Sequence, residues 1–520
     1  MRVWCWAVAD GADIVGYGQS IESFMLFVSS HPELYYFHNL KFDGSFIVDW
    51  LLRHSYRHVE GRPSKPGTFS SLIGDDGSWY CLRINAKGNL IEIRDSMKKL
   101  TMTIADMPGA FGFDGVAKGE IDYTRVRPPG YTPSDDEWEY VFADVRILGM
   151  AMAVLYEQGM TALTFSADTF TQYKTTIDFR KFFPALSAET DDYLRRAYRG
   201  GFTYADPRFT NTVHDVDGIV VDANSMYPSV MYYDQLPYGE PEPVDEMPSE
   251  GLWIGRMQLD IHIKPGHIPC LSETRHVLFG SAADYADHLE GEFTLTSVDW
   301  ELVTAQYDIV SYTFLDGFRF RSTNRLFRRH IDHWYEVKQN STGGRRLQAK
   351  YMLNSLYGRF GKRTVMAHKI PRLNDGGVVC FDRSADEDVE PEYIPVAAFV
   401  TAHARRRLIT AAQANYGTFA YCDTDSLHLL GGEVRGVEIH ESDLGAWKIE
   451  GRFDMAVYRR AKQYAERFDG VMDVHIAGLP RRIAGGLSFD DLLHGCEVGG
   501  KLVPKRVPGG VRLVETTFKL

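Results

Sequence analysis

Three carboxylates follow short apolar runs in the sequence. Asp222 comes directly after the run 218–221 (Gly-Ile-Val-Val), and Asp423 and Asp425 lie in residues 421–426 (Tyr-Cys-Asp-Thr-Asp-Ser). Carboxylates at strand ends are held rigidly but still face a cleft. Mg2+ takes oxygen ligands, usually one or two carboxylates plus substrate phosphates, and two such ions about 3.5–4 Å apart can drive an in-line displacement at phosphorus. These residues therefore indicate phosphoryl-transfer chemistry, although an isolated Asp-x-Asp is ordinarily a turn.

A second candidate site lies on a basic helix. Lys350, Asn354 and Tyr357 are spaced by four and three residues, which puts them on one helical face. A lysine can hold a triphosphate as a point charge, and an aromatic ring one turn later can stack on a base pair. Lys338, on the preceding helix, could point into the same groove. The alternative is an amphipathic helix whose cations extend into solvent.

The charge is distributed unevenly along the chain. The net charge of −13 over 520 residues argues by itself against nucleic-acid binding. Residues 325–363, however, carry ten Lys and Arg against two acidic residues. A single basic run is commonly a solvated helix face, but an acidic protein with one concentrated basic stretch also suits a channel that holds a polyanion.

The composition is that of an ordinary globular protein. Hydrophobic residues make up 44% and charged residues 24%, which excludes disorder, collagen and coiled coil as descriptions of the whole chain. No window is long and apolar enough for a membrane span, and the N-terminus does not have the pattern of a signal peptide. The six cysteines include no CxxC pair, which favours a reducing compartment. We therefore expect a cytoplasmic protein of several domains.

Periodicity and turn residues predict the elements that carry these side chains. Residues 1–150 read as an α/β region that ends in a helix over 134–156, and residues 236–320 read as mostly extended. A hairpin is expected around residues 374–377, and the last 45 residues are expected to be β. The remaining expected strands are 218–222, 419–423 and 426–430, and the remaining expected helices are 224–232, 325–338, 345–357 and 401–416.

Four spaced motifs resemble the polymerase motifs of family B DNA polymerases, in the family's order. They are residues 222–229 (Asp-Ala-Asn-Ser-Met-Tyr-Pro-Ser), 350–358 (Lys to Asn-Ser-Leu-Tyr-Gly), 421–426 and 462–464 (Lys-Gln-Tyr). The chain is most similar to the protein-primed branch, the replicases of small phages with linear genomes. This resemblance covers essentially the whole chain, including residues 198–201 (Tyr-Arg-Gly-Gly), 401–405 (Thr-Ala-His-Ala-Arg) and 507–510 (Val-Pro-Gly-Gly).

The resemblance implies a role for each matching residue. Asp222 and Asp425 would be catalytic carboxylates that hold two Mg2+ (or Mn2+) ions, with a further ligand from the Ala223 carbonyl and support from Asp423. Tyr227 would exclude a 2′-hydroxyl. The other implied nucleotide-binding residues are Lys338, Arg346, Lys350, Asn354 and Tyr357. The implied DNA-binding residues are Tyr198, Gly200, Gly201, Thr401, Arg405, Lys462 and Tyr464.

The implied fold is multidomain, of α/β and α+β classes, with a ribonuclease-H-like domain beside palm, fingers and thumb. The expected partners are template and primer DNA, dNTPs, a terminal protein as primer and a single-stranded-DNA-binding protein, with no membrane. The expected domains are a 3′–5′ exonuclease-like domain (1–164), palm (165–233 and 395–475), an insertion that contacts terminal protein (234–325), fingers (326–361), an insertion for strand displacement and processivity (362–394) and thumb (476–520).

The N-terminal region resembles the family's exonuclease but departs from its pattern. Asp43 and Asp144 match metal-binding positions, whereas the first motif, an Asp-x-Glu pair, would lie before residue 2. We therefore expect weak or no 3′–5′ exonuclease activity from this chain, and a natural start upstream. The other matching residues are Asn39, Phe42, Ser96, Met97, Lys118, Tyr123 and Tyr140.

Two alternatives to a protein-primed polymerase stay open on the sequence. One is a nuclease that uses Asp43 and Asp144 and has a decayed polymerase site. The other is a non-catalytic paralogue that binds DNA or terminal protein. The presence of Asp222, Lys350 and Asp425 favours the polymerase over both.

Overall fold

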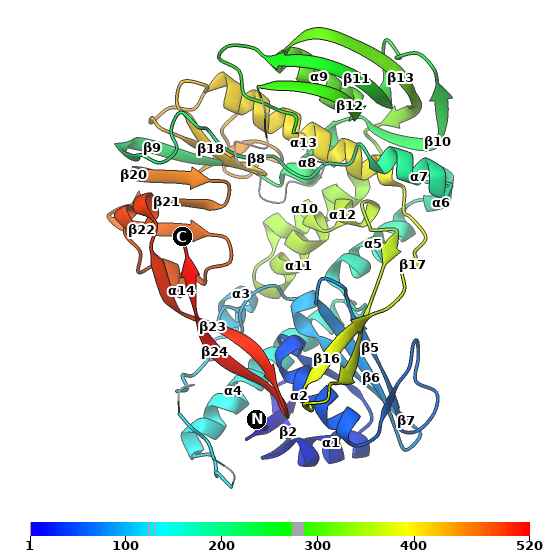
Figure 1. Ribbon diagram of the computed structural model, residues 1–520, viewed down its shortest axis with the longest axis vertical. Helices are drawn as coiled ribbons and strands as arrows, with labels where there is room; N and C mark the ends of the chain where they lie inside the picture. Colours follow the sequence, from blue (N-terminus) through cyan, green and yellow to red (C-terminus); the bar gives the residue numbers. More distant parts are fainter. Residues whose placement is uncertain (1, 123–124, 129, 273–284, 286) are drawn as a thin grey trace.

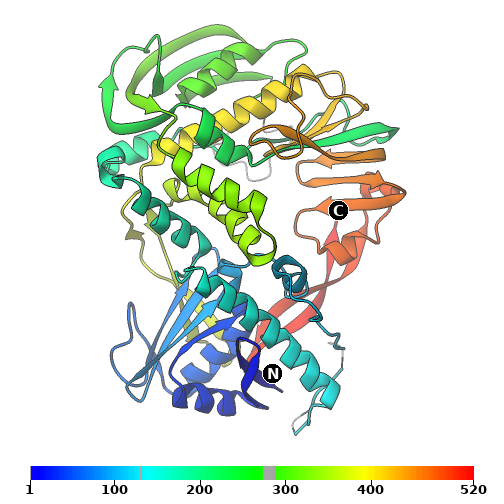
Figure 2. The same ribbon diagram turned by 180° about the vertical axis from the view of Figure 1, so that it is seen from behind.

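The computed structural model describes residues 2–122, 125–128, 130–272, 285 and 287–520. Tyr123 lies outside these residues. The N-terminal region forms one end of the molecule, and a second body of sheets and helices forms the other, with the C-terminal segment running between them (Figure 1). Seen from behind, the helices of residues 135–176 connect the two ends (Figure 2).

The N-terminal region is built on a five-stranded mixed sheet with the order β3-β7-β6-β5-β4. The β3–β7 and β4–β5 pairs are parallel and the others antiparallel. A separate hairpin, β1–β2, packs against the long helix α4. Its elements are β1 (Trp6–Asp10), β2 (Asp13–Gly18), α1 (Ile21–Ser30), β3 (Leu34–Phe37), α2 (Leu40–Arg53), β4 (Arg57–His58), β5 (Thr68–Ile73), β6 (Trp79–Ala86), β7 (Asn89–Asp95), α3 (Met107–Phe111) and α4 (Asp135–Glu157).

The central sheet is antiparallel, with the order β22-β21-β20-β9-β19-β18-β8. The sheet combines strands from both halves of the chain. β9, from the first half, lies between β20 and β19, which come from the second half. The buried helix α13 packs against α8 and the β18–β19 hairpin. The elements are α5 (Phe165–Thr176), α6 (Phe179–Phe182), α7 (Ala188–Arg195), β8 (Thr203–Ala205), β9 (Val213–Ala223), α8 (Met226–Tyr233), α13 (Ile394–Ala414), β18 (Phe419–Asp423), β19 (Ser426–Leu429), β20 (Trp447–Arg460), β21 (Gln463–Phe468) and β22 (Val471–Ile476).

The basic segment forms three helices where the sequence predicted two. They are α10 (Arg328–Asn340), α11 (Gly343–Asn354) and α12 (Leu356–Phe360). The expected continuous helix 345–357 is interrupted at Ser355, which closes α11 and opens α12. Leu356 and Phe360 on α12 are completely buried, so the break between the two helices lies beside the core. Tyr357 therefore lies on a different helix from Lys350 and Asn354.

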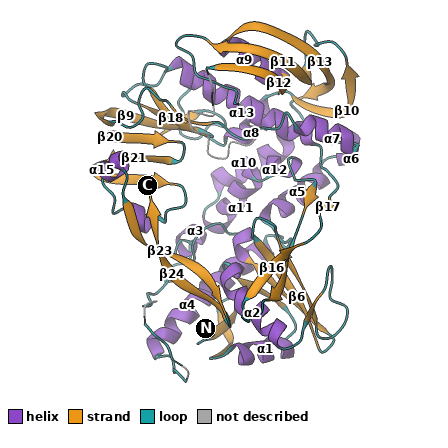
Figure 3. Ribbon diagram, in the orientation of Figure 1, coloured by secondary structure: helices purple, strands orange, loops and turns teal. Residues whose placement is uncertain are grey.

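The first insertion is a four-stranded antiparallel sheet with one helix, and all its strands are visible at one end of the molecule in Figure 3. Its elements are β10 (Leu236–Val244), β11 (Leu252–Ile263), β12 (His288–Thr296), α9 (Ser297–Gln306) and β13 (Tyr307–Thr323). The helix α9 interrupts the region that was predicted to be mostly extended. A reciprocal capping box between Thr296 and Asp299 starts this helix.

The second insertion and the C-terminal hairpin meet on the N-terminal region. Arg53 on α2 donates to the Gly377 carbonyl at 2.5 Å, and the Gly509 amide donates to Asp49 on the same helix at 3.1 Å. The Arg506 guanidinium lies 4.4 Å from the Phe381 ring centre. The elements are β14 (Val365–Met366), β15 (Lys369–Leu373), β16 (Val379–Arg383), β17 (Glu387–Asp388), α14 (Arg481–Ala484), α15 (Phe489–His494), β23 (Glu497–Val507) and β24 (Gly510–Lys519).

Several predicted elements have different limits in the structure. The strand predicted over 218–222 extends over Val213–Ala223, and the helix predicted over 401–416 begins at Ile394. The last 45 residues contain α14 and α15 in addition to the predicted β structure. None of the helices in the described parts of the chain is long and apolar enough to cross a membrane.

Candidate active site

Strand register brings Asp222 and Asp425 together from positions 203 residues apart in the sequence. Asp222 on β9 pairs with Ser426 on β19, directly after Asp425. The Ala223 amide donates to the Asp425 carbonyl at 2.9 Å. The two-residue turn between β18 and β19 has Thr424 in the left-handed region, at φ 60°, which aims the two flanking carboxylates at the same end of the sheet.

Both carboxyl groups are harder to ionise than an exposed aspartate. Burial raises the pKa of Asp222 to about 7, and the charges of Asp425 and Glu450 add to the shift. Burial also raises the pKa of Asp425 to about 6, with a further contribution from Asp423. A divalent cation between such groups would offset this repulsion, and an all-oxygen donor set is what Mg2+ prefers. The residues therefore fit a magnesium site.

Asp423 is held in place by its neighbours. Its Oδ1 accepts from Thr203 Oγ1 at 3.0 Å and from Thr424 Oγ1 at 3.1 Å. Lys462 Nζ makes a close ion pair with the same carboxylate, and the Lys462 amide donates to the Tyr421 hydroxyl at 3.1 Å. Lys462 lies in the turn between β20 and β21, so its contact with Asp423 joins this turn to the β18–β19 turn.

Four cations gather beside the carboxylates. Burial lowers the pKa of Lys338, and the charges of Arg346, Lys350 and Lys448 lower it further. Lys338 Nζ donates to Ser225 Oγ at 3.1 Å, and Ser225 follows Asp222 by three residues. Arg346 and Lys350 are exposed on α11, as is Asn354 one turn later. These cations are a suitable environment for the phosphates of a nucleotide.

Two tyrosines with rings in close, tilted contact lie beside this cluster. The ring centres of Tyr227 on α8 and Tyr357 on α12 are 4.1 Å apart with 31° between their planes. Gly201 fits closely against them, because a Cβ there would meet Tyr227 Oη at 3.0 Å and the Thr424 side chain at 3.1 Å. Tyr198 packs in the same way against Gly361. The 198–201 segment therefore lies against the carboxylate turn.

Three of the predicted DNA-binding side chains point into the protein. Thr401 and Arg405 are buried, and Arg405 donates to Asp299 at 2.6 Å and to the Gly200 carbonyl at 2.8 Å. Tyr464 is buried against Tyr421. Each of these side chains packs against neighbours within the protein, and its contact with DNA stays a prediction. Gly200, in contrast, is exposed.

Sequence reasoning missed several polar groups behind the carboxylates. Lys448 on β20 lies opposite Asp222 in the sheet. His428 on β19 makes a 2.6 Å bond to buried Glu466, and its other ring nitrogen lies 3.3 Å from Ser426 Oγ. Only the pairing of distant strands places Lys448 and Glu466 here, so no local signal could have found them, whereas His428 lies three residues after Asp425 on the chain.

The N-terminal region contains a cavity of about 920 Å3, and Asp43 and Asp144 both line it. Burial raises the pKa of Asp43 to about 7. Asp144 forms an ion pair with Lys118 at 3.2 Å, and this charge opposes the rise that burial causes in the pKa of Asp144. Lys118 also lies 5.5 Å from the centre of the Tyr140 ring.

The remaining predicted residues of this region have different surroundings. Asn39 is exposed in a left-handed conformation at φ 71°, and Phe42 is half-buried one turn into α2. Ser96 is fully buried and donates to the Phe37 carbonyl at 3.1 Å, and its role in binding single-stranded DNA stays a prediction. Met97 beside it is exposed.

Comparisons with known proteins agree with this arrangement. Residues 116–442 match the family model "DNA polymerase type B, organellar and viral". The chain is 35% identical to the DNA polymerase of Bacillus phage phi29, over all of this chain and 96% of the relative. It is 32% identical to the DNA polymerase of Streptococcus phage Cp-1, over 93% of this chain and 87% of the relative.

The three-dimensional similarity also spans the chain. Phi29 DNA polymerase in complex with primer-template DNA superposes with a TM-score of 0.93 at 34% identity, over all of this chain and 96% of that one. The same enzyme with primer-template DNA and incoming nucleotide substrates gives a TM-score of 0.90 at 32% identity, over 100% of both chains. The predicted multidomain fold is confirmed, and the chain belongs to the family B DNA polymerases of the phi29-type phages.

Proposed function

We propose that this DNA polymerase adds nucleotides by a two-metal-ion mechanism at Asp222 and Asp425, with Ala223 as a further ligand. The supporting observation is the strand register that joins the two carboxylates at a buried position, where burial raises the pKa of both. Mg2+ or Mn2+ bound there would lower the barrier by activating the primer hydroxyl and neutralising charge on the leaving phosphate. Asp423 keeps its place through Thr203 and Lys462 and supports the site without being a ligand.

The incoming nucleotide would lie between the cation cluster and the tyrosine pair. Lys338, Arg346 and Lys350 would bind the triphosphate, and Lys448 adds positive charge on the opposite side, next to Asp222. The Tyr227 ring, braced by Tyr357, fills the volume that a 2′-hydroxyl would need. Asn354, exposed on α11, would border the nascent base pair.

Replacement of Asp425 by Ala tests the metal assignment. We expect loss of nucleotide addition with nearly unchanged affinity for primer-template DNA, because phosphate contacts supply most of that affinity. Asp454→Ala is a matched control, since this exposed aspartate on β20 pairs with Arg467 away from the site. Primer extension at the wild-type rate by the Asp425 variant would remove the carboxylate from the mechanism.

We further propose that template and primer DNA pass through a ring formed by the palm, the C-terminal hairpin, the N-terminal region and the second insertion. The contacts of α2 with Gly377 and Gly509 join the last three parts. Val379 of the insertion is buried in the core of the N-terminal region. Enclosure of DNA in this way supports long synthesis and strand displacement, as expected for residues 362–394.

Priming by a terminal protein is the remaining part of the proposal. Its support is the similarity to the phi29-type enzymes over the whole chain, which includes the insertion 234–325 as a folded sheet. The test is incubation of the chain with the terminal protein of its own genome, Mg2+ and labelled dNTPs. Label that becomes covalently attached to the terminal protein supports the proposal. If the chain extends a DNA primer but does not label the terminal protein, the proposal of polymerase activity stands and the proposal of protein priming is refuted.

Exonuclease activity of the 520-residue chain is proposed to be weak. Asp144 already forms an ion pair with Lys118 at 3.2 Å, and this pair would have to break before the carboxylate could bind a metal ion. A mismatched 3′ end incubated with Mg2+ or Mn2+ measures this activity. Rapid trimming that is abolished by Asp144→Ala would show the opposite.

A further inference from the structure

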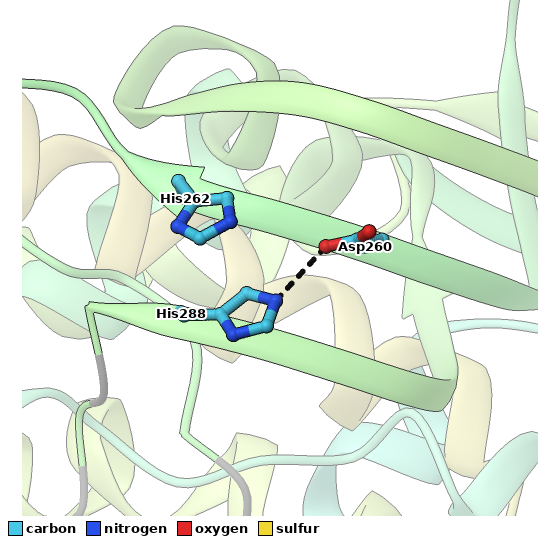
Figure 4. Close-up of side chains that lie close together, drawn as sticks. All are labelled: Asp260, His262 and His288. Atoms are coloured by element: carbon cyan, nitrogen blue, oxygen red, sulfur yellow. Dashed lines mark hydrogen bonds and ion pairs between the residues drawn. The ribbon is translucent and has the colours of Figure 1, made fainter.

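Two histidines and an aspartate share one exposed face of the first insertion. His262 on β11 lies directly opposite His288 on β12 in the antiparallel register. Asp260 is two residues before His262 on the same strand, so its side chain points to the same face of the sheet. Figure 4 shows the three side chains on the two adjacent strands, with the imidazole rings one above the other.

The three side chains are already in contact. His288 Nε2 lies 2.9 Å from Asp260 Oδ1. The ring centres of His262 and His288 are 4.1 Å apart and their planes differ by 3°. One ligand atom from each residue lies within 4.8 Å of the other two. All three groups are at least partly exposed, so the rings can tilt without displacing a packed core.

We propose that Asp260, His262 and His288 bind one divalent transition-metal ion of the zinc class. Two imidazoles with one carboxylate are a ligand set that suits Zn2+ and its neighbours, whereas Mg2+ prefers oxygen ligands throughout. Zinc ligands at about 2.0–2.1 Å from the metal are roughly 3.3 Å from one another in tetrahedral geometry. The ligand atoms lie within 4.8 Å of one another, but the two ring planes are parallel, so the exposed imidazoles would turn on binding until one nitrogen of each points at the ion. Three protein ligands leave the fourth position to water.

The surrounding charges favour a cation on this face. Glu290 on β12 is directly opposite Asp260, and Asp308 on β13 is directly opposite His262. Directly opposed residues of antiparallel strands share a face of the sheet, so both acids lie next to the three ligands. Both are exposed. They add negative potential that attracts a divalent ion and opposes its release.

The position of the ligands gives the bound ion a structural effect. β11 ends at Ile263 and β12 begins at His288, so the ligands lie where the chain leaves the sheet and returns to it. An ion held by both strands would fasten the two ends of this long connection. Because coordination requires neutral imidazoles, binding should weaken as the pH falls. The effect is independent of the magnesium ions proposed for the polymerase site.

The experiment is a metal titration of the full chain without an affinity tag. Zn2+ binding is measured by calorimetry, and Co2+ is used as a spectroscopic probe of the ligand set. We expect one tight ion per chain. His262→Ala and His288→Ala should each weaken Zn2+ binding by at least about tenfold. Loss of a residue that only hydrogen-bonds to a metal ligand already costs about 10–100-fold in affinity, so loss of a ligand should cost no less. His494→Ala is the matched control, because His494 and Asp490 on α15 form only a two-residue pair and should not affect the tight ion.

Hydrogen exchange provides a second readout that does not depend on activity. Zn2+ should slow the exchange of amides at the end of β11 and the start of β12 in the wild-type chain and in the His494 variant, but not in His262→Ala. Asp260→Asn, which keeps the shape of the side chain, should reduce affinity while leaving the fold unchanged. Tight binding that survives in a correctly folded His262→Ala, His288→Ala double variant would overturn the proposal, as would the absence of a tight ion in the wild-type chain.

Discussion

Arg405 joins the first insertion to the 198–201 segment beneath the active site. Its guanidinium donates to buried Asp299 at 2.6 Å and to the carbonyls of Arg199 and Gly200 at 2.9 and 2.8 Å. Both charged side chains are less than 10% exposed. Arg405→Met would leave the Asp299 carboxylate buried without this partner, and breaking a buried pair from one side typically costs about 3–5 kcal/mol. We expect a loss of that size in the free energy of unfolding.

The adjacent arginine is a matched control. Arg406 also pairs with an acidic residue of α9, Glu301, at 2.6 Å, but these side chains are 34% and 61% exposed. Arg406 also lies 3.5 Å from Asp234, which keeps its 2.6 Å pair with Arg407 in the variant. Exposed pairs contribute about 0–1 kcal/mol, so Arg406→Ala should have a small effect. Adding Asp299→Asn to Arg405→Met should recover part of the lost stability, because it removes the uncompensated charge. Pulse proteolysis in urea measures the stability of this part of the multidomain chain.

The pH dependence of the stability of the Arg405 variant tests whether the charge of Asp299 causes the loss of stability. In the wild type, burial would raise the pKa of Asp299, but the charges of Arg405 and Arg199 outweigh it and hold the pKa below its usual value. Asp299 thus stabilises the fold above its unfolded-state pKa, and this contribution is lost as the pH falls. Without Arg405, burial prevails and the pKa rises. The difference in stability between variant and wild type should therefore shrink on acidification from pH 7.

Two results would refute this reasoning. One is a stability loss under about 1 kcal/mol for Arg405→Met, equal to that of the exposed control. The other is unchanged stability together with a weaker salt dependence of DNA binding, in which the slope of log affinity against log salt concentration decreases by about one. This decrease corresponds to the loss of one phosphate contact and would identify Arg405 as a direct DNA ligand.

Further predictions concern sugar selection and enclosure of DNA. Tyr227→Val should weaken discrimination between dATP and ATP by about 10–200-fold if the ring is the main steric barrier. Tyr233→Val changes an exposed tyrosine at the end of the same helix and should leave this discrimination unchanged. Unchanged selectivity of the Tyr227 variant in steady-state incorporation would show that the ring does not exclude the 2′-hydroxyl. Asp49→Ala removes the acceptor of the Gly509 amide and the partner of Arg53. It should shorten products on primed circular templates while single-nucleotide addition stays normal; equal product lengths would contradict the enclosed ring.

The local parts of the fold were predictable from sequence because their causes are local. The hairpin around Asp423 and Asp425 follows from two apolar runs separated by a two-residue turn, and α4 begins at a Ser134 capping box close to its predicted start. The four motifs identified the family because they lie within short stretches of chain. The spacing of Lys350 and Asn354 likewise put both on one exposed helical face.

Tertiary burial changed the limits of several elements. Helix periodicity continued through Ser355, but the structure ends α11 at Asn354 and starts α12 at Leu356, whose buried side chain packs in the core. The helix α13 begins seven residues before its predicted start, within a segment that is almost wholly buried. A buried helix is apolar on all sides, and its start therefore carries no amphipathic signal.

Which distant residues face one another was decided only by the tertiary structure. The sequence placed Thr401, Arg405 and Tyr464 among DNA-binding residues, but only the structure shows that all three are buried against other parts of the protein. It also gave no sign that Lys448 would lie opposite Asp222, or His262 opposite His288. Such pairs depend on strand order and register across long separations in the chain. Sequence spacing determines which side chains share a local face, but sheet assembly determines what that face meets.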